Sequence, residues 1–534
     1  MAVITPQTDV YLLKVPLEID ETNQLTFSNA TAQYNYFNSL PKKSVDNFTY
    51  QRKDGTIRYG ANFDDIMTYN YVMYRNDAYS NKWFYAYIDD MEYLNDNVTA
   101  ISIKNDPWQT WQFDLVYKRT FVEREHVNDD TLGNHTLDEG LDLGDYIINS
   151  SHTLKPNLTV VDYDNDAILG LKYPIFFQVS ELVSGISIAS SQWDQGYNGI
   201  FSGLYYFAVT SYSAARNIIS RYDSAGKGEA IIAIFLAPME FLDGAKKFGE
   251  LGYNIYIPQD TGRPTTLINT ATITRPTTLN GYSPKNNKLF VYPFSYVYVS
   301  NNTGIDSTFR YEDFANASPK FMMAGALGQG CTIKLCPVSY KKYTANTEVF
   351  EYGITGAKYP VCAWSSDYYT NWVTQNAVNM GISVGSGLLS AGVNASYGNY
   401  AGAASSLLNS IGGVMAERYQ AQVHPDQAKG NTNSSDILIG WERYYTVDCM
   451  SVRAEVARSI DDFFTMFGYK VNRVKLPNVT GRRNWNYVKT IGCYIDGDIP
   501  QSDMQEIKDM FDRGVTFWHN PSTFADYSQN NDII

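Results

Sequence analysis

The stretch Lys82-Trp-Phe-Tyr-Ala-Tyr-Ile88, followed by Val98-Thr-Ala-Ile-Ser-Ile103, decides the fold class of this 534-residue chain. Both segments are rich in aromatic and β-branched residues, which fit the half-buried surface of a sheet. The polar run Asn95-Asp-Asn97 between them is typical of a turn. We therefore predict a β-hairpin, and the 43 tyrosines of the chain extend this preference to a protein that is mainly β with some α.

Further strands and two helices are predicted from shorter patterns. The apolar runs 173–179 and 230–236 are typical of buried strands and are too short to span a bilayer as helices. Residues 453–467 and 502–512 have helical patterning, and a glycine that suits a helix C-cap follows each of them.

The length predicts several domains, because one hydrophobic core does not organise 534 residues. We expect an N-terminal β tube domain over 1–127, middle β-rich domains over 128–367, an apolar loop over 368–440 and a C-terminal α+β segment over 441–534. Residues 128–166 are acidic and loop-rich, which indicates a boundary or an exposed arm.

The stretch from Tyr368 to Ala416 contains no charged residue, although 18% of the chain is charged. Its apolar residues recur at helical spacing and its glycines follow small-xxx-small patterns, so it predicts an apolar helical or loop hairpin. Such a hairpin suits burial at a subunit interface, and it also suits entry into a membrane. The residues expected to carry either role are Met380, Ile382, Val384, Leu388, Leu389, Val393, Leu407, Leu408, Ile411, Val414 and Met415.

The formal net charge of −14 disfavours attraction to nucleic-acid backbones or anionic membrane surfaces. Selection for solubility alone would also produce an acidic surface. The first seventeen residues lack the pattern of a secretory signal, so we expect synthesis and residence in a cytosol.

Residues that would indicate catalysis or metal binding are scattered. The five cysteines lack the spacing of a zinc or redox site and are expected to be reduced core thiols. None of the five histidines lies in a metal-ligand spacing, and a carboxylate pair such as Asp89 with Glu92 is common in loops. We therefore expect no enzyme activity, no metal and no cofactor.

Two blocks of the chain resemble the tail-knob (distal tail tube) proteins of picovirus-type podoviruses (Picovirinae; Salasmaviridae and Rountreeviridae), short-tailed phages of Gram-positive bacteria. The N-terminal block carries Gln33-Tyr-Asn-Tyr-Phe-Asn-Ser39, Asn81-Lys-Trp-Phe-Tyr-Ala-Tyr87, Trp108-Gln-Thr-Trp-Gln-Phe-Asp114, Phe121-Val-Glu-Arg-Glu-His-Val127 and Thr136-Leu-Asp-Glu-Gly-Leu141. The C-terminal block carries Phe463-Phe464, Gly468-Tyr-Lys-Val-Asn-Arg-Val-Lys475, Pro477-Asn478, Asn486-Tyr-Val488, Gly497-Asp-Ile499, Asp503-Met-Gln-Glu-Ile507 and Gly514-Val-Thr-Phe-Trp-His519.

The resemblance implies a structural virion protein that is assembled in the host cytoplasm and becomes part of the phage tail. It implies a homohexameric tube below the lower collar (connector) protein, in contact with tail appendages and a tail-tip protein. Genomic DNA would pass through the lumen without specific binding. Apolar loops of the family plug the channel and insert into the host membrane during ejection, and residues 368–416 lie at the matching place.

Charge and resemblance agree, because an acidic conduit repels the polyanion that passes through it. An alternative from another class is a receptor-binding tail fibre or appendage, which would also be rich in tyrosine and asparagine. Fibres are usually trimers with sequence repeats, and no repeat or long heptad is evident in this chain.

Overall fold

The computed structural model divides the chain into two compact units. Unit 1 contains residues 1–144, 282–289 and 454–534, and unit 2 contains residues 145–281 and 290–453. The residues described below are 8–45, 55–76, 81–155, 174–184, 186, 205–242, 245–250, 253–258, 266–302, 304–326, 332–341, 350–355, 361–365, 429–432 and 445–534. The finer division expected from the sequence stays a prediction.

The first sheet of unit 1 is antiparallel and has six strands in the order β3-β1-β5-β6-β7-β4. The strands are β3 (Lys42–Val45), β1 (Thr8–Leu13), β5 (Tyr71–Asn76), β6 (Trp83–Asn95), β7 (Val98–Asn105) and β4 (Thr56–Tyr59). Three helices accompany it: α1 (Ala30–Ser39), α2 (Phe63–Ile66) and α3 (Pro107–Trp111). Strands β6 and β7 are the predicted hairpin, which is confirmed.

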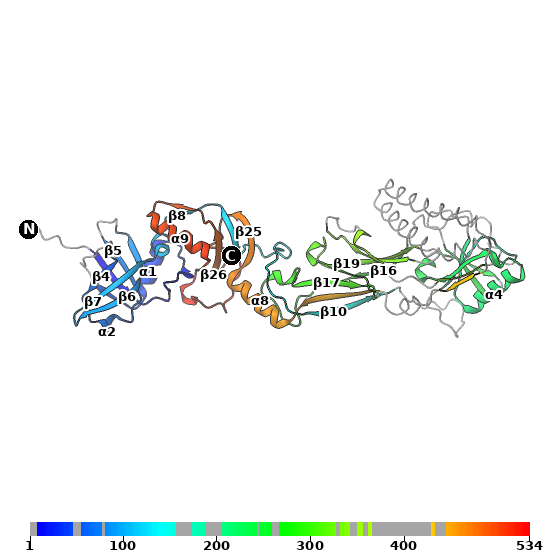
Figure 1. Ribbon diagram of the computed structural model, residues 1–534, viewed down its shortest axis with the longest axis horizontal. Coiled ribbons are helices and arrows are strands. Elements are labelled where there is room, and N and C mark those ends of the chain that lie inside the picture. Colours follow the sequence, from blue (N-terminus) through cyan, green and yellow to red (C-terminus); the bar gives the residue numbers. More distant parts are fainter. Residues whose placement is uncertain are drawn as a thin grey trace, which may run out of the picture. The chain divides into compact units, whose positions relative to one another are not determined.

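The second sheet of unit 1 combines strands from the two ends of the chain in the order β2-β28-β26-β9-β25. The strands are β2 (Asn23–Leu25), β28 (Val515–Trp518), β26 (Trp485–Ile491), β9 (Thr120–Glu125) and β25 (Tyr469–Lys475). A two-stranded ladder adds β8 (Leu115–Tyr117) and β27 (Ile495–Gly497). In Figure 1 the orange and red C-terminal elements lie beside the cyan and blue N-terminal ones. Strands β2, β8 and β9 from the first part of the chain thus pair with strands from its last part.

Helices α8 (Ala454–Phe467) and α9 (Gln501–Arg513) of unit 1 confirm the two predicted helices. The buried residues of α8 are Ala457, Ile460, Asp461 and Phe464, a spacing that places them on one helix face. Gly468 follows α8 with φ of 65°, and Gly514 follows α9 with φ of 98°. Glycine adopts these angles at no steric cost, so the two predicted C-terminal glycines end both helices.

The described residues of unit 2 form three sheets. A four-stranded sheet has the order β10 (Tyr146–Leu154), β24 (Tyr445–Val452), β17 (Ser295–Ser300) and β18 (Asp306–Phe309). A second has the order β16 (Thr266–Thr272), β19 (Lys320–Ala326), β20 (Thr332–Val338) and β21 (Ile354–Thr355). The seven-stranded third sheet has the order β14 (Lys246–Glu250), β15 (Tyr253–Ile257), β12 (Tyr205–Val209), β11 (Ile175–Val179), β13 (Ile231–Leu236), β22 (Val361–Ser365) and β23 (Lys429–Thr432).

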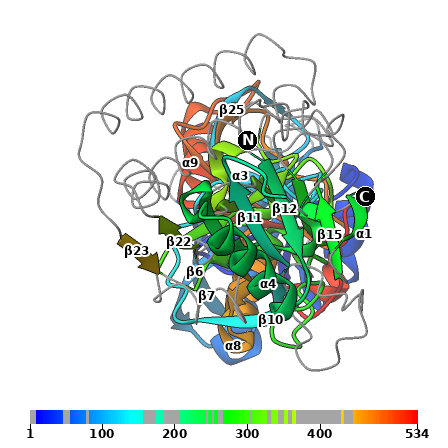
Figure 2. The ribbon, with the colours of Figure 1, turned by 90° about the vertical axis from the view of Figure 1, so that its right-hand side faces the viewer.

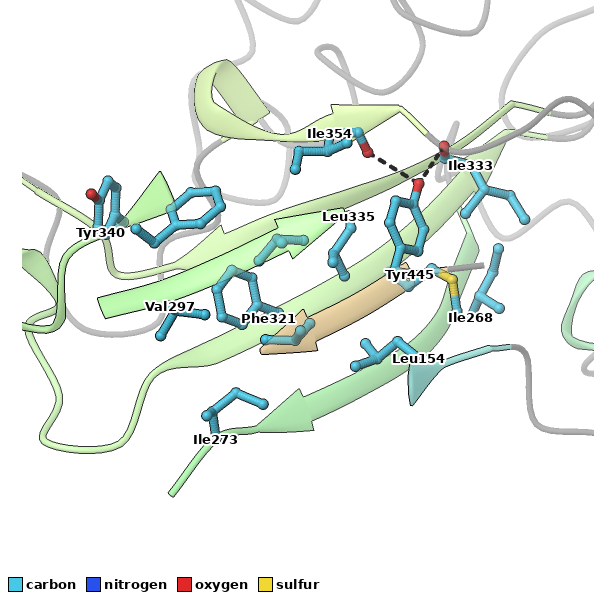
Figure 3. Packing of buried hydrophobic residues seen from close by; sticks show 14 of the residues in the cluster. Leu154, Ile268, Ile273, Val297, Phe321, Ile333, Leu335, Tyr340, Ile354 and Tyr445 are labelled. Atoms are coloured by element: carbon cyan, nitrogen blue, oxygen red, sulfur yellow. Dashed lines mark hydrogen bonds between the residues drawn. The ribbon is translucent and has the colours of Figure 1, made fainter. Parts of the chain in front are cut away.

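The two four-stranded sheets of unit 2 share one buried core (Figure 3). Strand β17 alternates buried and half-buried residues, which puts Val297 and Val299 in this core. The Tyr445 hydroxyl donates toward the carbonyls of Ile333 and Ile354, at 2.9 and 3.0 Å. This polar tip thereby keeps a partner inside an otherwise apolar core.

Helix α4 (Tyr212–Ser224) packs on the seven-stranded sheet, and Figure 2 shows it across β11 and β12. Its residues Ala214, Ala215, Ile218 and Tyr222 lie in one core with apolar side chains of β11, β12 and β15. Strands β11 and β13 confirm the two buried strands predicted from apolar runs.

Short 3-10 helices connect several elements; they are Gly228–Ala230, Met239–Leu242, Asn287–Phe290, Tyr311–Asp313, Phe350–Tyr352 and Pro521–Thr523.

The fold class is confirmed, since the protein is mainly β with some α. Cys336, Cys449 and Cys493 are buried, as predicted for core thiols.

The expectation of a loop over residues 128–166 is wrong at β10. Residues 146–154 form an edge strand that pairs with β24. Most of its side chains are exposed or half-buried, so the strand lacks the apolar alternation by which strands are recognised.

Candidate functional site

The predicted plug and membrane residues, from Met380 to Met415, lie outside the described residues. In the part of the chain that the structure describes, no helix is both long and apolar enough to cross a membrane. The same residues include no cluster of three or more histidine, cysteine, aspartate or glutamate side chains that could hold a metal ion.

A network of polar side chains in unit 1 surrounds the segment 282–289. This segment belongs to unit 1, although its sequence neighbours on both sides belong to unit 2. Three acidic side chains hold this segment: Asp130 and Glu139 from the connection after β9, and Asp461 from α8. We refer to these three residues as the carboxylate cluster.

Asp461 is fully buried and accepts hydrogen bonds from four donors. The Tyr282 hydroxyl and the Lys285 backbone N–H donate to one oxygen, each at 2.7 Å. The backbone N–H and side-chain amide of Asn286 donate to the other, at 3.0 and 2.8 Å. Because a buried carboxylate without partners is costly, these contacts both satisfy Asp461 and fix the segment on α8.

Glu139 forms the ionic centre of the cluster. It pairs with Lys288 and with Arg124, and it accepts the Lys470 backbone N–H at 3.0 Å. The side chains of Glu139 and Lys288 are each only 1% exposed. Burial lowers the pKa of the Lys288 amine, and the charge and hydrogen bond of Glu139 oppose that shift.

Asp130 joins the segment to β25. Its carboxylate accepts the Asn287 backbone N–H at 3.1 Å and the Tyr469 hydroxyl at 2.7 Å. Burial raises the pKa of Tyr469, and the neighbouring Asp130 charge adds to that effect, so the phenol stays a donor at neutral pH.

His126, at the end of β9, is a buried neutral side chain beside the cluster. Its Nε2 donates to the Thr465 carbonyl at 3.0 Å, and its Nδ1 accepts the Tyr487 backbone N–H at 2.7 Å. Burial lowers the pKa of His126 to about 3, with the nearby Arg482 as a second cause. The tautomer is fixed because the carbonyl only accepts and the amide only donates.

This arrangement suits mechanical connection rather than chemistry, because each carboxylate of the cluster already accepts several internal hydrogen bonds. Sequence reasoning missed it, since Asp130 and Glu139 lie in the stretch expected to be a boundary or an exposed arm. One signal was present in the sequence: Asp461 lies on the apolar face of α8, where a carboxylate requires buried partners.

Known proteins similar to this one match it along nearly the whole chain. Tail knob protein gp9 of Bacillus phage phi29 is 25% identical over 603 residues, with 98% of each chain covered. Tail knob protein gp9 of Bacillus phage B103 is 25% identical over 624 residues, again with 98% of each chain covered.

The structure of the bacteriophage C1 tail knob protein gp12 shares this fold, with a TM-score of 0.68 at 14% identity over 99% of this chain and 100% of that one. Residues 6–117 match the family model of the caudoviral major tail protein N-terminus. The model for the C-terminal domain of tail knob protein gp9 of Bacillus phage phi29 matches residues 263–532, just over half of the chain. The chain therefore belongs to the phi29 gp9 family of tail knob proteins, which are structural components of the phage virion tail.

Proposed function

We propose that this tail knob protein forms a homohexameric tube through which the phage genome leaves the virion. The observation that carries the proposal is the similarity to a tail knob protein over 98% of this chain and 98% of that protein. The tube would attach to the lower collar (connector) protein and bear the tail appendages and tail-tip protein.

The net charge of −14 supports a role as a conduit. A channel wall that bound DNA phosphates would slow the genome, whereas an acidic or neutral wall repels them. The lumen therefore conducts DNA without specific binding.

The uncharged stretch from Tyr368 to Ala416 supports a second role, in closing the tube and entering the host membrane. Inside a closed tube, its apolar residues gain about 25 cal/mol for each Å² of apolar surface buried. In lipid, the lack of charge avoids the roughly 2.5–3.5 kcal/mol that each central Asp, Lys or Arg costs. The same segment is thus compatible with a buried and an inserted state.

The proposed function includes no catalysis. The relatives are named as tail knob proteins, and the carboxylates described above are engaged in holding the chain. Purified protein is therefore expected to release no sugar or peptide from cell wall. Release that a single substitution abolishes would contradict this expectation.

The oligomeric state tests the tube directly. Light scattering with negative-stain imaging is expected to give a hollow ring of six copies. A stable 60.3 kDa monomer at micromolar concentration would contradict the tube, and a three-fold rod would instead favour a fibre. A gel-shift assay is expected to show no retention of duplex DNA at physiological salt.

Liposome permeabilisation tests the membrane role. Protein exposed to low pH is expected to release dye, while deletion of residues 380–415 leaves hexamers intact and abolishes release. Leu388→Asp with Leu408→Asp should act like the deletion, because two charges per copy would enter hydrocarbon, whereas Leu388→Ile with Leu408→Ile should retain release. Equal release by the deletion variant and the parent would show that the segment has no part in membrane entry.

A further inference from the structure

An apolar row crosses the outer face of the second sheet of unit 1. In the register of β26, β9 and β25, Phe121 lies opposite Ile491 on one side and opposite Val474 on the other. Directly opposed residues of neighbouring strands point to the same face of a sheet. Phe121, Val474 and Ile491, which we call the outer row, therefore form one continuous apolar strip.

The outer row is open in the single chain. Val474 is 62% exposed and Ile491 is 57% exposed, although valine and isoleucine are usually among the most buried residues. Leu476 continues the strip past the end of β25. Val116 of β8 and Tyr494, the residue before β27, are also exposed. Contiguous exposed apolar side chains with a charged rim mark interaction surfaces.

The position of β25 adds to this argument. Among the described residues, strand β25 is the last strand on its side of the sheet, so the row extends to the edge of that sheet. Natural proteins protect such edges from pairing with other chains by covering them or by placing charged side chains on them. Here the edge strand carries the exposed Val474, which suits a partner that offers an apolar group.

The surroundings of the outer row are basic. Three cations lie within three residues of the row along β9 and β26, namely Lys118, Arg119 and Lys489. Two carboxylates lie among them, with Glu123 2.9 Å from Lys489 and Asp496 4.0 Å from Lys118. This excess of positive charge contrasts with the net −14 of the whole chain.

The complementary surface is present on the same chain, at the end of the β6–β7 hairpin. Tyr93 and Leu94 are exposed there. The exposed acidic residues Asp89, Asp90, Glu92 and Asp96 surround them. The tip thus offers two apolar side chains inside an acidic rim, opposite in sign to the rim of the outer row.

We propose that the outer row of one copy receives the β6–β7 hairpin tip of a second copy. Within one chain both surfaces are exposed, so the tip leaves its own outer row uncovered. A contact between two different patches of identical chains is heterologous, and repetition of such a contact closes a ring when the rotation allows. The inference rests on the proposed tube and identifies one surface that would join its subunits.

A disulfide ladder tests the geometry. The variant with both Leu94→Cys and Val474→Cys is expected to form covalent multimers, from dimer upward, on oxidation of assembled protein. Either substitution alone lacks one half of the contact and should give no ladder, which also controls for the five native cysteines.

The outcomes separate the two proposals. The double variant could form rings and yet give no ladder, or only a monomer with an internal disulfide. That result would overturn the hairpin contact and leave the proposed tube intact. A parent chain that stays monomeric would overturn both.

A charge substitution supplies a second measurement. Val474→Asp is expected to raise the concentration for half-maximal assembly by about tenfold or more, because the contact would bury a carboxylate among acidic side chains. Leu267→Asp, at a comparably exposed strand position of unit 2, is the matched control and should leave assembly unchanged. An equal effect of the two substitutions, or none from Val474→Asp, would contradict the proposal.

Discussion

Gly468 and Glu125 lie so close together that a side chain at position 468 would meet the backbone of Glu125. A Cβ at this position would lie 2.2 Å from the Glu125 carbonyl oxygen and 2.5 Å from the His126 nitrogen. Gly468 also has φ of 65°, in the region that favours glycine. The end of α8 and the end of β9 are therefore in direct backbone contact.

This contact predicts a large difference between two glycine substitutions. Gly468→Ala should destabilise unit 1 by well over the roughly 1–2 kcal/mol of a left-handed backbone alone, because rigid backbone atoms would have to move. Gly492→Ala is the control, since Gly492 has the same φ of 65° with no atom within 4 Å of the added Cβ. Denaturant unfolding measures both, and equal losses would show that the close approach has no energetic weight.

Asp461→Asn should destabilise the protein by about 2–4 kcal/mol. Asparagine keeps the size of the side chain but replaces one acceptor oxygen with an amide that faces the donors of segment 282–289. Asp462→Asn, at the adjacent exposed position, is expected to change stability by less than about 0.5 kcal/mol. Similar unfolding free energies for the two variants would contradict the assigned role of Asp461.

Glu139→Gln should cost about 3–5 kcal/mol, because it leaves the buried Lys288 and the largely buried Arg124 without their negative partner. The exposed pair of Glu181 with Lys227 offers a comparison in unit 2. Glu181→Gln should cost less than about 1 kcal/mol, as exposed ion pairs do. Thermal and denaturant unfolding compare the two, and a small loss for Glu139→Gln would mean that water reaches the pair.

The buried histidines predict acid sensitivity. The pKa values of His126 and His519 are lowered to about 3 and about 4, chiefly by burial. As the pH falls, these two histidines bind protons in the unfolded chain before they do so in the folded one. Their contribution to the free energy of unfolding is therefore largest above about pH 6.5 and decreases as the pH drops toward their folded-state pKa values. Burial raises the pKa of Asp106 to about 6, and this group acts in the opposite direction between about pH 6 and 4.

His126→Gln isolates one contribution to this pH dependence. Between pH 6.5 and 5, the parent should lose about 1.6 kcal/mol more than the variant, because the slope approaches 1.36 kcal/mol for each pH unit as the unfolded histidine becomes fully protonated. Denaturation midpoints at pH 8, 6.5 and 5 give the two slopes. Parallel slopes would show that His126 is protonated in the folded state.

Local patterns predicted the hairpin of β6 and β7 and the ends of α8 and α9, because alternation and terminal glycines act over a few residues. The pairing of β2 with β28 and of β9 with β25 was not predictable in the same way. Each strand carries its own pattern, while the choice of partner depends on packing between distant segments. Strand β10 was missed because its pairing with β24 uses backbone groups and few buried side chains.

The same distinction applies to the polar network of unit 1. The sequence around an acidic loop residue does not show whether that residue is solvated or, like Glu139, paired with a buried lysine. Only Asp461 carried a signal in the sequence, because it interrupts an apolar helix face. The plug residues from Met380 to Met415 were chosen from the lack of charge, the helical spacing and the family resemblance, and they stay a prediction.

The parallel pairing of β2 with β28 has a consequence for synthesis. Residues 23–25 leave the ribosome almost 500 residues before their partners at 516–518. The N-terminal part of unit 1 therefore waits with an incomplete second sheet while all of unit 2 is translated, and contacts of such sequence separation fold slowly. Chains truncated before residue 516 would lack the partner strand of β2 and would therefore be left out of assembly.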